Sequence, residues 1–149
     1  MPGGALFNPE ATEGRDWTMT RTHRGLVVVV DDERDVRSTL EEILESEGYI
    51  VLQARDGTEA LARMRGVEGP VIALIDLMMP SMNGWELISA MKDDRAMRRI
   101  PVVVLTARGR EAVEGANLVL EKPPVVPALL AAIRELLNGL DAPSDHAAG

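Results

Sequence analysis

Short runs of aliphatic residues alternate along the chain with stretches in which apolar residues recur at helical spacing. Five such runs cover residues 26–30, 49–54, 71–75, 101–105 and 117–121. Val, Ile and Leu fill most of them without alternating polar residues, which is typical of strands that are covered on both faces. The pattern therefore predicts five strands in a buried sheet.

Amphipathic stretches separate these predicted strands. The first of them has apolar residues three or four positions apart and a glycine stop signal: Val36, Leu40, Ile43, Leu44 and Gly48. This spacing is that of one helix face. The same reading predicts helices over residues 36–48, 57–66, 84–94 and 127–139, and one or two helical turns around residues 110–114.

The order of these elements, a strand followed by a helical stretch and repeated five times, predicts the fold class. Parallel neighbours need crossover connections, and right-handed helical crossovers produce a doubly wound α/β sheet. In such a sheet the carboxyl ends of all strands meet at one edge, and ligands bind there where the strand order reverses.

The two ends of the chain do not follow this pattern. Residues 1–24 are rich in Gly, Pro and Thr, and the chain ends GLDAPSDHAAG. We expect a flexible N-terminal extension over residues 1–24, one folded domain over residues 25–138, and a flexible tail over residues 139–149.

Composition narrows the class of protein further. The chain has 149 residues and a formal net charge of −8, which argues against a nucleic-acid partner because phosphate binding needs a basic surface. It contains no cysteine, so disulfides and thiolate metal sites are excluded, and we expect a cytoplasmic location. No apolar run approaches the length of a membrane span, so no membrane partner is expected.

Polar residues follow four of the predicted strands at the point where each strand ends. They are Asp31, Asp32, Asp76, Thr106 and Lys122. Each has an ordinary explanation, since an Asp can cap a helix or begin a turn, a Thr can end a strand, and a Lys can be a solvated charge. Because carboxyl ends of parallel strands share one edge, however, we expect all five side chains to meet in one crevice.

Three carboxylates in one crevice repel each other unless a cation lies among them. Lys122 supplies a single positive charge, and an all-oxygen ligand set suits Mg²⁺. His23 and His146 both lie in the predicted tails, so zinc is not favoured. A metal, a lysine and a threonine around a carboxylate nucleophile are suited to a phosphoryl group and an aspartyl phosphate.

These residues resemble the receiver domain of two-component response regulators, over about residues 25–138. Four motifs carry the resemblance: the acidic pair in VVVVDDE, the DLMMPSMNGWEL block, the LTA turn, and GANLVLEKP. The resemblance implies a flavodoxin-like sheet of five parallel strands in the order 2-1-3-4-5.

The resemblance also implies a role for each acidic residue. Asp76 would be the phosphorylated residue and would contribute to the metal site. Asp32 would bind Mg²⁺ directly, and Asp31 would act through a metal-bound water. The backbone carbonyl of Met78 would complete the share of the metal shell that the protein provides.

The remaining site residues receive roles from the same resemblance. Lys122 would pair with the phosphoryl oxygens, and Thr106 would move to bond one of them after phosphorylation. Ala107 would leave room beside the phosphate, and the bond between Lys122 and Pro123 would be cis.

Two features depart from the pattern of the family. Val119 occupies the switch position at which many members carry Tyr or Phe. Only the residues from Ala107 to Glu114 are available for a fourth helix, so this helix is expected to be shortened or replaced by a loop. The usual switch, in which Thr106 and an aromatic residue move together, then cannot operate in its common form, and we expect the loop at residues 108–115 to report phosphorylation instead.

The sequence thus predicts a stand-alone response regulator that is not an enzyme beyond its own phosphorylation and dephosphorylation. A sensor histidine kinase or phosphotransfer protein would supply the phosphoryl group, and an unknown output protein would receive the signal. The alternative is a receiver-like docking module that acts independently of phosphorylation. A phosphatase of the haloacid-dehalogenase type is disfavoured because its two aspartates are separated by one residue, and a nucleotide-binding Rossmann domain because no glycine-rich loop follows the first strand.

Overall fold

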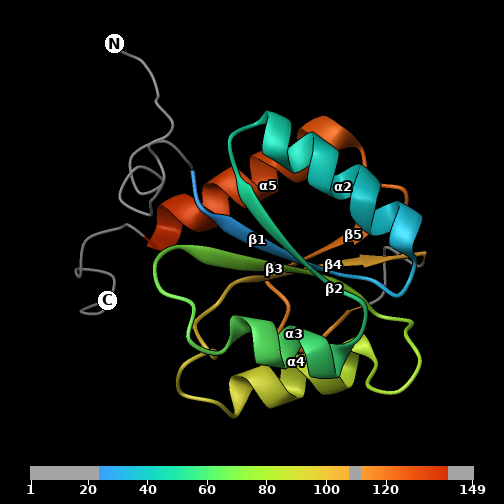
Figure 1. The fold of residues 1–149 in the computed structure, drawn as a ribbon, viewed down its shortest axis with the longest axis vertical. Helices are drawn as coiled ribbons and strands as arrows, with labels where there is room; N and C mark the ends of the chain where they lie inside the picture. Colours follow the sequence, from blue (N-terminus) through green and yellow to red (C-terminus); the bar gives the residue numbers. More distant parts are fainter. Residues whose placement is uncertain (1–23, 108–111, 141–149) are drawn as a thin grey trace, which may run out of the picture.

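The computed structural model describes residues 24–107 and 112–140, which form one sheet with helices on both sides (Figure 1). The strands are β1 (Leu26–Val30), β2 (Ile50–Ala54), β3 (Val71–Asp76), β4 (Val102–Thr106) and β5 (Leu118–Glu121). The described helices are α2 (Arg34–Ser46), α3 (Gly57–Met64), α4 (Gly84–Lys92) and α5 (Val126–Leu140).

All neighbouring strands are parallel, and their order is β2-β1-β3-β4-β5. From β1 the chain moves outward to β2 and then crosses to β3 on the other side of β1. The ends of β1 and β3 are level, because Val30 pairs with Ile75. The predicted doubly wound sheet is therefore confirmed, with its switch point between β1 and β3.

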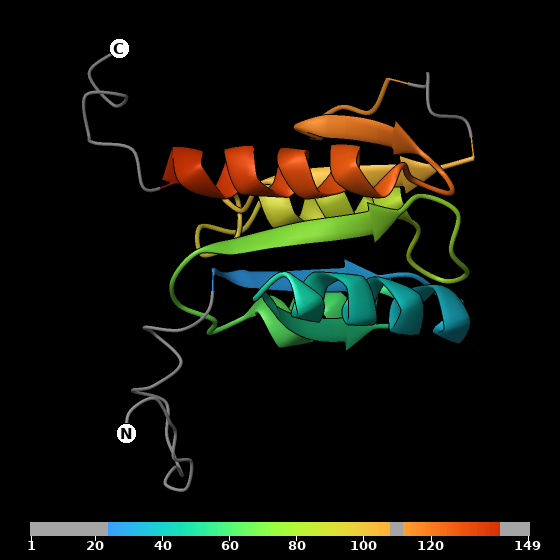
Figure 2. The ribbon, with the colours of Figure 1, turned by 90° about the horizontal axis from the view of Figure 1, so that it is seen from above.

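Two apolar layers hold the helices against the sheet. Figures 1 and 2 show α2 and α5 on one face, and Figure 1 shows α3 and α4 on the other. Val27 and Val29 face the first layer, whereas Val28 and Val30 face the second. This two-sided burial explains why β1 is a run of valines rather than an alternating strand.

The connection from β4 to β5 lacks the helix found at the other crossovers, within the residues that are described. Ala107 and residues 112–117 form no helix, and Arg108–Glu111 lie outside the described residues. Val113 is buried in the layer beneath α4. The expected loss of a full fourth helix is thus confirmed for this part of the connection. Of the helical turns predicted around residues 110–114, the described part, residues 112–114, forms none.

The helix boundaries differ from the sequence predictions by a few residues. For instance, α4 ends at Lys92, and α5 continues through Gly139 to Leu140 instead of stopping at the glycine. Residues 1–23 and 141–149, which make up nearly all of the predicted flexible ends, lie outside the described residues. Among the helices described, none is both long and apolar enough to cross a bilayer.

Candidate functional site

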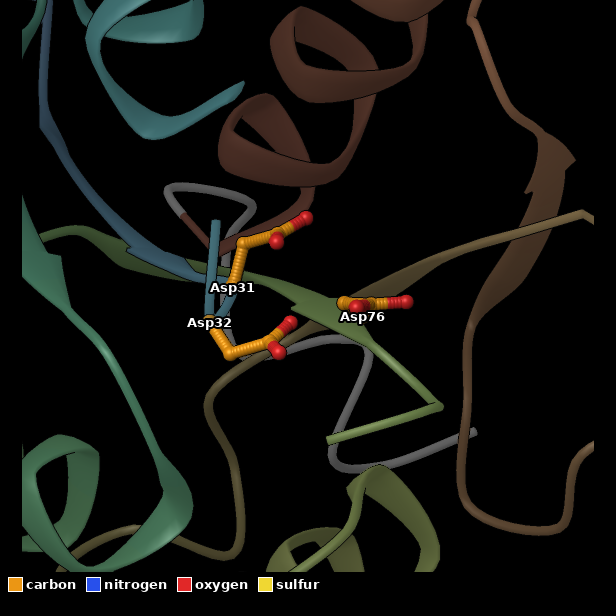
Figure 3. Close-up of side chains that lie close together, drawn as sticks. All are labelled: Asp31, Asp32 and Asp76. Carbon is orange, nitrogen blue, oxygen red and sulfur yellow. The ribbon is translucent and has the colours of Figure 1, made fainter. Parts of the chain in front are cut away.

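The three predicted aspartates meet where β1 and β3 end (Figure 3). Asp31 and Asp32 follow β1 directly, and Asp76 is the last residue of β3. One carboxylate oxygen from each residue lies within 4.8 Å of those of the other two. Asp31 and Asp76 are buried, whereas Asp32 is exposed, so the cluster is open to solvent on one side.

Lys122 reaches this cluster from beyond β5. Its Nζ donates a hydrogen bond to Asp31 Oδ2 at 2.9 Å and lies 3.8 Å from Asp76 Oδ1. Burial alone would lower the pKa of Lys122, but the hydrogen bond from Lys122 to Asp31 and the negative charges of Asp31 and Asp76 raise it overall. The bond between Lys122 and Pro123 is cis, as the family resemblance implied.

The carboxyl group of Asp76 has an unusual affinity for protons. Its burial, followed by the negative charge of Asp31, raises the pKa of Asp76 to about 6, against the lowering effect of Lys122. The cluster therefore has more negative charge than its single lysine neutralises. A divalent cation at this position would offset the repulsion.

Thr106 ends β4 at the same edge of the sheet. Its strand neighbour Leu105 pairs with Asp76 in the register of β3 and β4, so Thr106 lies one position beyond Asp76. Thr106 is buried, and its carbonyl accepts the backbone N–H of Lys122 at 2.9 Å. All five residues predicted from the strand ends thus lie at one edge of the sheet.

The loop after Asp76 folds back onto its own strand. The backbone N–H of Gly84 donates to the carbonyl of Leu77 at 2.9 Å. A Cβ at Gly84 would lie 2.8 Å from Leu77 Cα and 2.9 Å from the carbonyl oxygen of Asp76, so only glycine fits here. The backbone N–H of Met78 points to Asp76 Oδ1 at 3.4 Å, while the side chain of Met78 is exposed.

The start of α4 fixes the other end of this loop. Asn83 caps the helix by accepting the N–H of Glu86, and the side chain of Glu86 accepts the N–H of Asn83 in return. This reciprocal capping satisfies two donors at the helix start. The motif from Asp76 to Gly84 is therefore a closed loop held at both ends, which places the backbone of Met78 beside Asp76.

Comparison with known proteins identifies this arrangement. A family model described as the response regulator receiver domain matches residues 27–134, which includes every residue of the site. The chain belongs to this family. Receiver domains are signalling modules rather than classical enzymes, so the phosphatase and Rossmann alternatives are not supported.

Several known proteins are similar to this chain over most of its length. The transcriptional regulatory protein CpxR of Klebsiella pneumoniae is 39% identical over 118 residues, covering 75% of this chain and 49% of that protein. The response regulator MprA of Mycobacterium ulcerans is 38% identical over 133 residues, covering 82% and 54%. Protein PilG of Pseudomonas aeruginosa is 34% identical over 116 residues, covering 72% and 84%. The chain spans about half the length of CpxR and MprA.

Solved structures agree with the family. A CheY-like response regulator receiver domain protein from Methanospirillum hungatei has a TM-score of 0.70 at 27% identity, over 80% of this chain and 98% of that chain. The signal receiver domain of a histidine kinase from Syntrophus aciditrophicus has a TM-score of 0.71 at 26% identity, over 80% and 95%. Receiver domains interact with histidine kinases and output proteins, and they generally bind Mg²⁺ at an acidic pocket. This chain has a cluster of three aspartates at the edge of its sheet.

Val119, which the sequence analysis assigned to the switch position, lies in β5 opposite Val104. It is partly buried and packs against the layer beneath α4. A valine has neither the ring nor the hydroxyl of a tyrosine. The residue that differs from the Tyr or Phe of many family members is therefore a side chain that packs against its neighbours.

Arg37 contacts the backbone of the site, although the sequence analysis did not identify it as a site residue. Its Nη1 donates to the backbone carbonyl of Asp31 at 2.7 Å, and its Nε donates to Gln53 Oε1 at 2.8 Å. A glutamine in the otherwise apolar strand β2 was the available signal, because a polar group in a buried layer needs a partner.

An apolar groove of about 540 Å³ adjoins the receiver site between α2 and the loop before α5. Its lining includes the apolar residues Val36, Leu40, Ile43, Pro123, Pro124 and Val126. Lys122 lies at the same groove. The groove therefore gives the acidic site an apolar neighbour on the face formed by α2 and α5.

Proposed function

We propose that this receiver domain accepts a phosphoryl group on Asp76 from a phosphohistidine of a sensor histidine kinase or phosphotransfer protein. The observation that carries the proposal is the meeting of three carboxylates within 4.8 Å, with Lys122 Nζ 2.9 Å from Asp31 and 3.8 Å from Asp76. Phosphorylation would change the charge at this edge and favour one conformation of the surface that an output protein reads.

The donor set fits Mg²⁺. Asp32 and Asp76 would supply carboxylate oxygens directly, and Asp31 would act through a metal-bound water. The backbone carbonyl of Met78, whose N–H lies 3.4 Å from Asp76 Oδ1, would add another oxygen ligand. Hard oxygen ligands with room for water match the preference of this ion. When bound, Mg²⁺ would supply positive charge that neutralises the carboxylates and the phosphoryl oxygens.

The residues of the chain would then share the work of the transfer. A carboxylate oxygen of Asp76 attacks phosphorus, the phosphorus–nitrogen bond of the phosphohistidine breaks, and its electron pair returns to the imidazole. Lys122 would contact the transferred oxygens from the position it already occupies. The Thr106 hydroxyl, one position beyond Asp76 along the edge, would donate to one of these oxygens afterwards.

The phosphodonor must bring its histidine to the open side of the site. The apolar groove beside Lys122 supports this part of the proposal, because an amphipathic helix carrying the histidine could bury its apolar face there. The folded unit would correspond to the predicted residues 25–138, extended to Leu140 by the end of α5. A cytoplasmic location fits a chain without cysteine.

Acetyl phosphate with Mg²⁺, followed by intact mass measurement, tests the proposal. Wild type is expected to gain the mass of one phosphoryl group, and Asp76→Asn to gain none. Asp93→Asn, which changes an exposed aspartate at the end of α4, is the matched control and should be labelled like wild type. Labelling of Asp76→Asn at the wild-type rate, or labelling that persists in EDTA, would contradict the assignment.

A docking module that acts independently of phosphorylation is the second candidate. Val119 and the missing helix in the described part of the β4–β5 connection favour it, because both change the part of the fold that would respond to Thr106. If this candidate is right, folded wild-type protein would gain no phosphoryl group from acetyl phosphate and Mg²⁺.

A further inference from the structure

A chain of polar contacts crosses the otherwise apolar layer between α2 and the sheet. Leu40 and Leu44 of α2 are buried in this layer, yet Arg37 and Gln53 meet within it as half-buried side chains. Arg37 Nε donates to Gln53 Oε1 at 2.8 Å, and Gln53 Nε2 donates to Glu41 Oε1. The Gln53 amide is therefore paired through both its oxygen and its nitrogen, and Arg37 Nε is held toward β2.

The other end of this chain of contacts is at the acidic site. Arg37 Nη1 donates to the backbone carbonyl of Asp31 at 2.7 Å. Asp31 is also held by its N–H, which donates to Ala54, and by its Oδ1, which accepts the N–H of Glu33. The guanidinium thus fixes the carbonyl of the peptide that joins Asp31 to Asp32.

Stability alone does not explain this arrangement. Apolar side chains of similar shape in such a layer stabilise a fold as well as a paired polar group does, or better. A guanidinium that bridges a helix, a neighbouring strand and a turn instead fixes geometry, because its donors are arranged in a rigid plane.

We propose that Arg37 is a positioning residue of the metal site. By holding the Asp31 carbonyl and Gln53 at once, it sets the turn after β1 so that Asp31 and Asp32 face Asp76. The inference rests on the proposed function, because it concerns how the same carboxylates bind Mg²⁺. Contacts behind the ligands of metal sites typically change metal affinity by about 10–100-fold when they are removed.

The direction in which the Mg²⁺ affinity changes distinguishes a positioning role of Arg37 from an effect of its charge. Loss of a positive charge near an anionic site would strengthen Mg²⁺ binding, whereas loss of positioning weakens it. Arg34, an exposed arginine at the start of the same helix, provides the matched control. Arg37→Met should therefore weaken binding, while Arg34→Met should leave it unchanged or slightly tighter.

The test is an NMR titration of the ¹⁵N-labelled chain with Mg²⁺, together with amide exchange measured in EDTA. We expect Arg37→Met to raise the Kd for Mg²⁺ about tenfold, as contacts behind metal ligands do. Arg37→Lys, which keeps the charge but cannot hold both acceptors in one plane, should lie between Arg37→Met and wild type. In EDTA, the Glu33 amide should exchange faster in Arg37→Met than in Arg34→Met.

A second variant guards against loss of the fold. The double variant Arg37→Met/Gln53→Leu replaces both partners of the Nε contact by apolar side chains, so the stability should be unchanged or higher while the Mg²⁺ affinity falls. A merely structural role would change both quantities in the same direction.

Several results would overturn the inference. They are wild-type Mg²⁺ affinity in folded Arg37→Met, full recovery in Arg37→Lys, or unchanged exchange of the Glu33 amide. If wild type itself binds no Mg²⁺, the proposed function fails, and the exchange arm still decides whether Arg37 holds the turn.

Discussion

At the scale of single residues, Asp76 illustrates how a site differs from its sequence motif. Burial raises the pKa of Asp76 to about 6, and the nearby charge of Asp31 adds to the effect. In the metal-free protein the folded state therefore holds this proton more tightly than the unfolded chain does. The stability that the protonated group contributes is present at low pH and is lost as the pH rises through about 6.

The direction of this pH dependence predicts how the stability of Asp76→Asn changes in the absence of metal. The amide cannot ionise, so the variant should gain stability over wild type as the pH rises, by on the order of 2 kcal/mol between about pH 4 and pH 8. Urea unfolding of both proteins in EDTA at the two pH values measures the gain. Asp93→Asn is the control and should show no comparable change, and a gain of equal size at both pH values would contradict the explanation.

At the scale of elements, the sequence predicted the strands, most of the helices and the edge of the sheet at which the site lies. Continuous aliphatic runs identified five strands covered on both faces, and acids at their ends identified the site edge, because both depend on local order and on parallel topology. Arg37 was missed because its partners Asp31 and Gln53 come from other elements, and only the packed structure brings them together. The helix boundaries shifted because packing against the sheet, rather than a local glycine, decides where a helix stops.

The connection that replaces the fourth helix lies directly on α4. Gly115 has a positive φ of 89°, and a Cβ there would lie 2.7 Å from Ile88 Cγ2. Gly66 has a similar φ of 86° but has nothing within 4 Å of the Cβ position. The two glycines therefore share the backbone strain that any other residue would meet and differ in the contact.

Alanine at each glycine tests this difference. Gly66→Ala should lower the free energy of unfolding by about 1 kcal/mol through backbone strain alone. Gly115→Ala should lower it by about 2–4 kcal/mol, because the clash with Ile88 adds to the strain. Chemical denaturation of the two variants beside wild type provides the comparison, and equal losses would mean that the connection does not press on α4.

At the scale of the whole molecule, the topology produces a site that no single segment contains. Lys122 and Asp31 are 91 positions apart in the chain, yet they form a hydrogen bond at 2.9 Å because β5 and β1 end at one edge. The same convergence places three carboxylates together with only one lysine in contact. The folded protein without metal therefore carries like-charge repulsion that the unfolded chain lacks.

A cation that binds only the folded state should relieve this repulsion and stabilise the molecule as a whole. At a Mg²⁺ concentration of about 100 times its Kd, the expected gain is about 2.7 kcal/mol, and EDTA should abolish it. Thermal unfolding with increasing Mg²⁺ measures the gain. Asp32→Asn should lose most of it because a proposed ligand is removed, whereas Glu33→Gln, an exposed neighbour outside the cluster, should keep it. If Asp32→Asn and wild type were stabilised equally, the ion would be binding elsewhere on an acidic surface, and the convergence of the strand ends would not be what holds it.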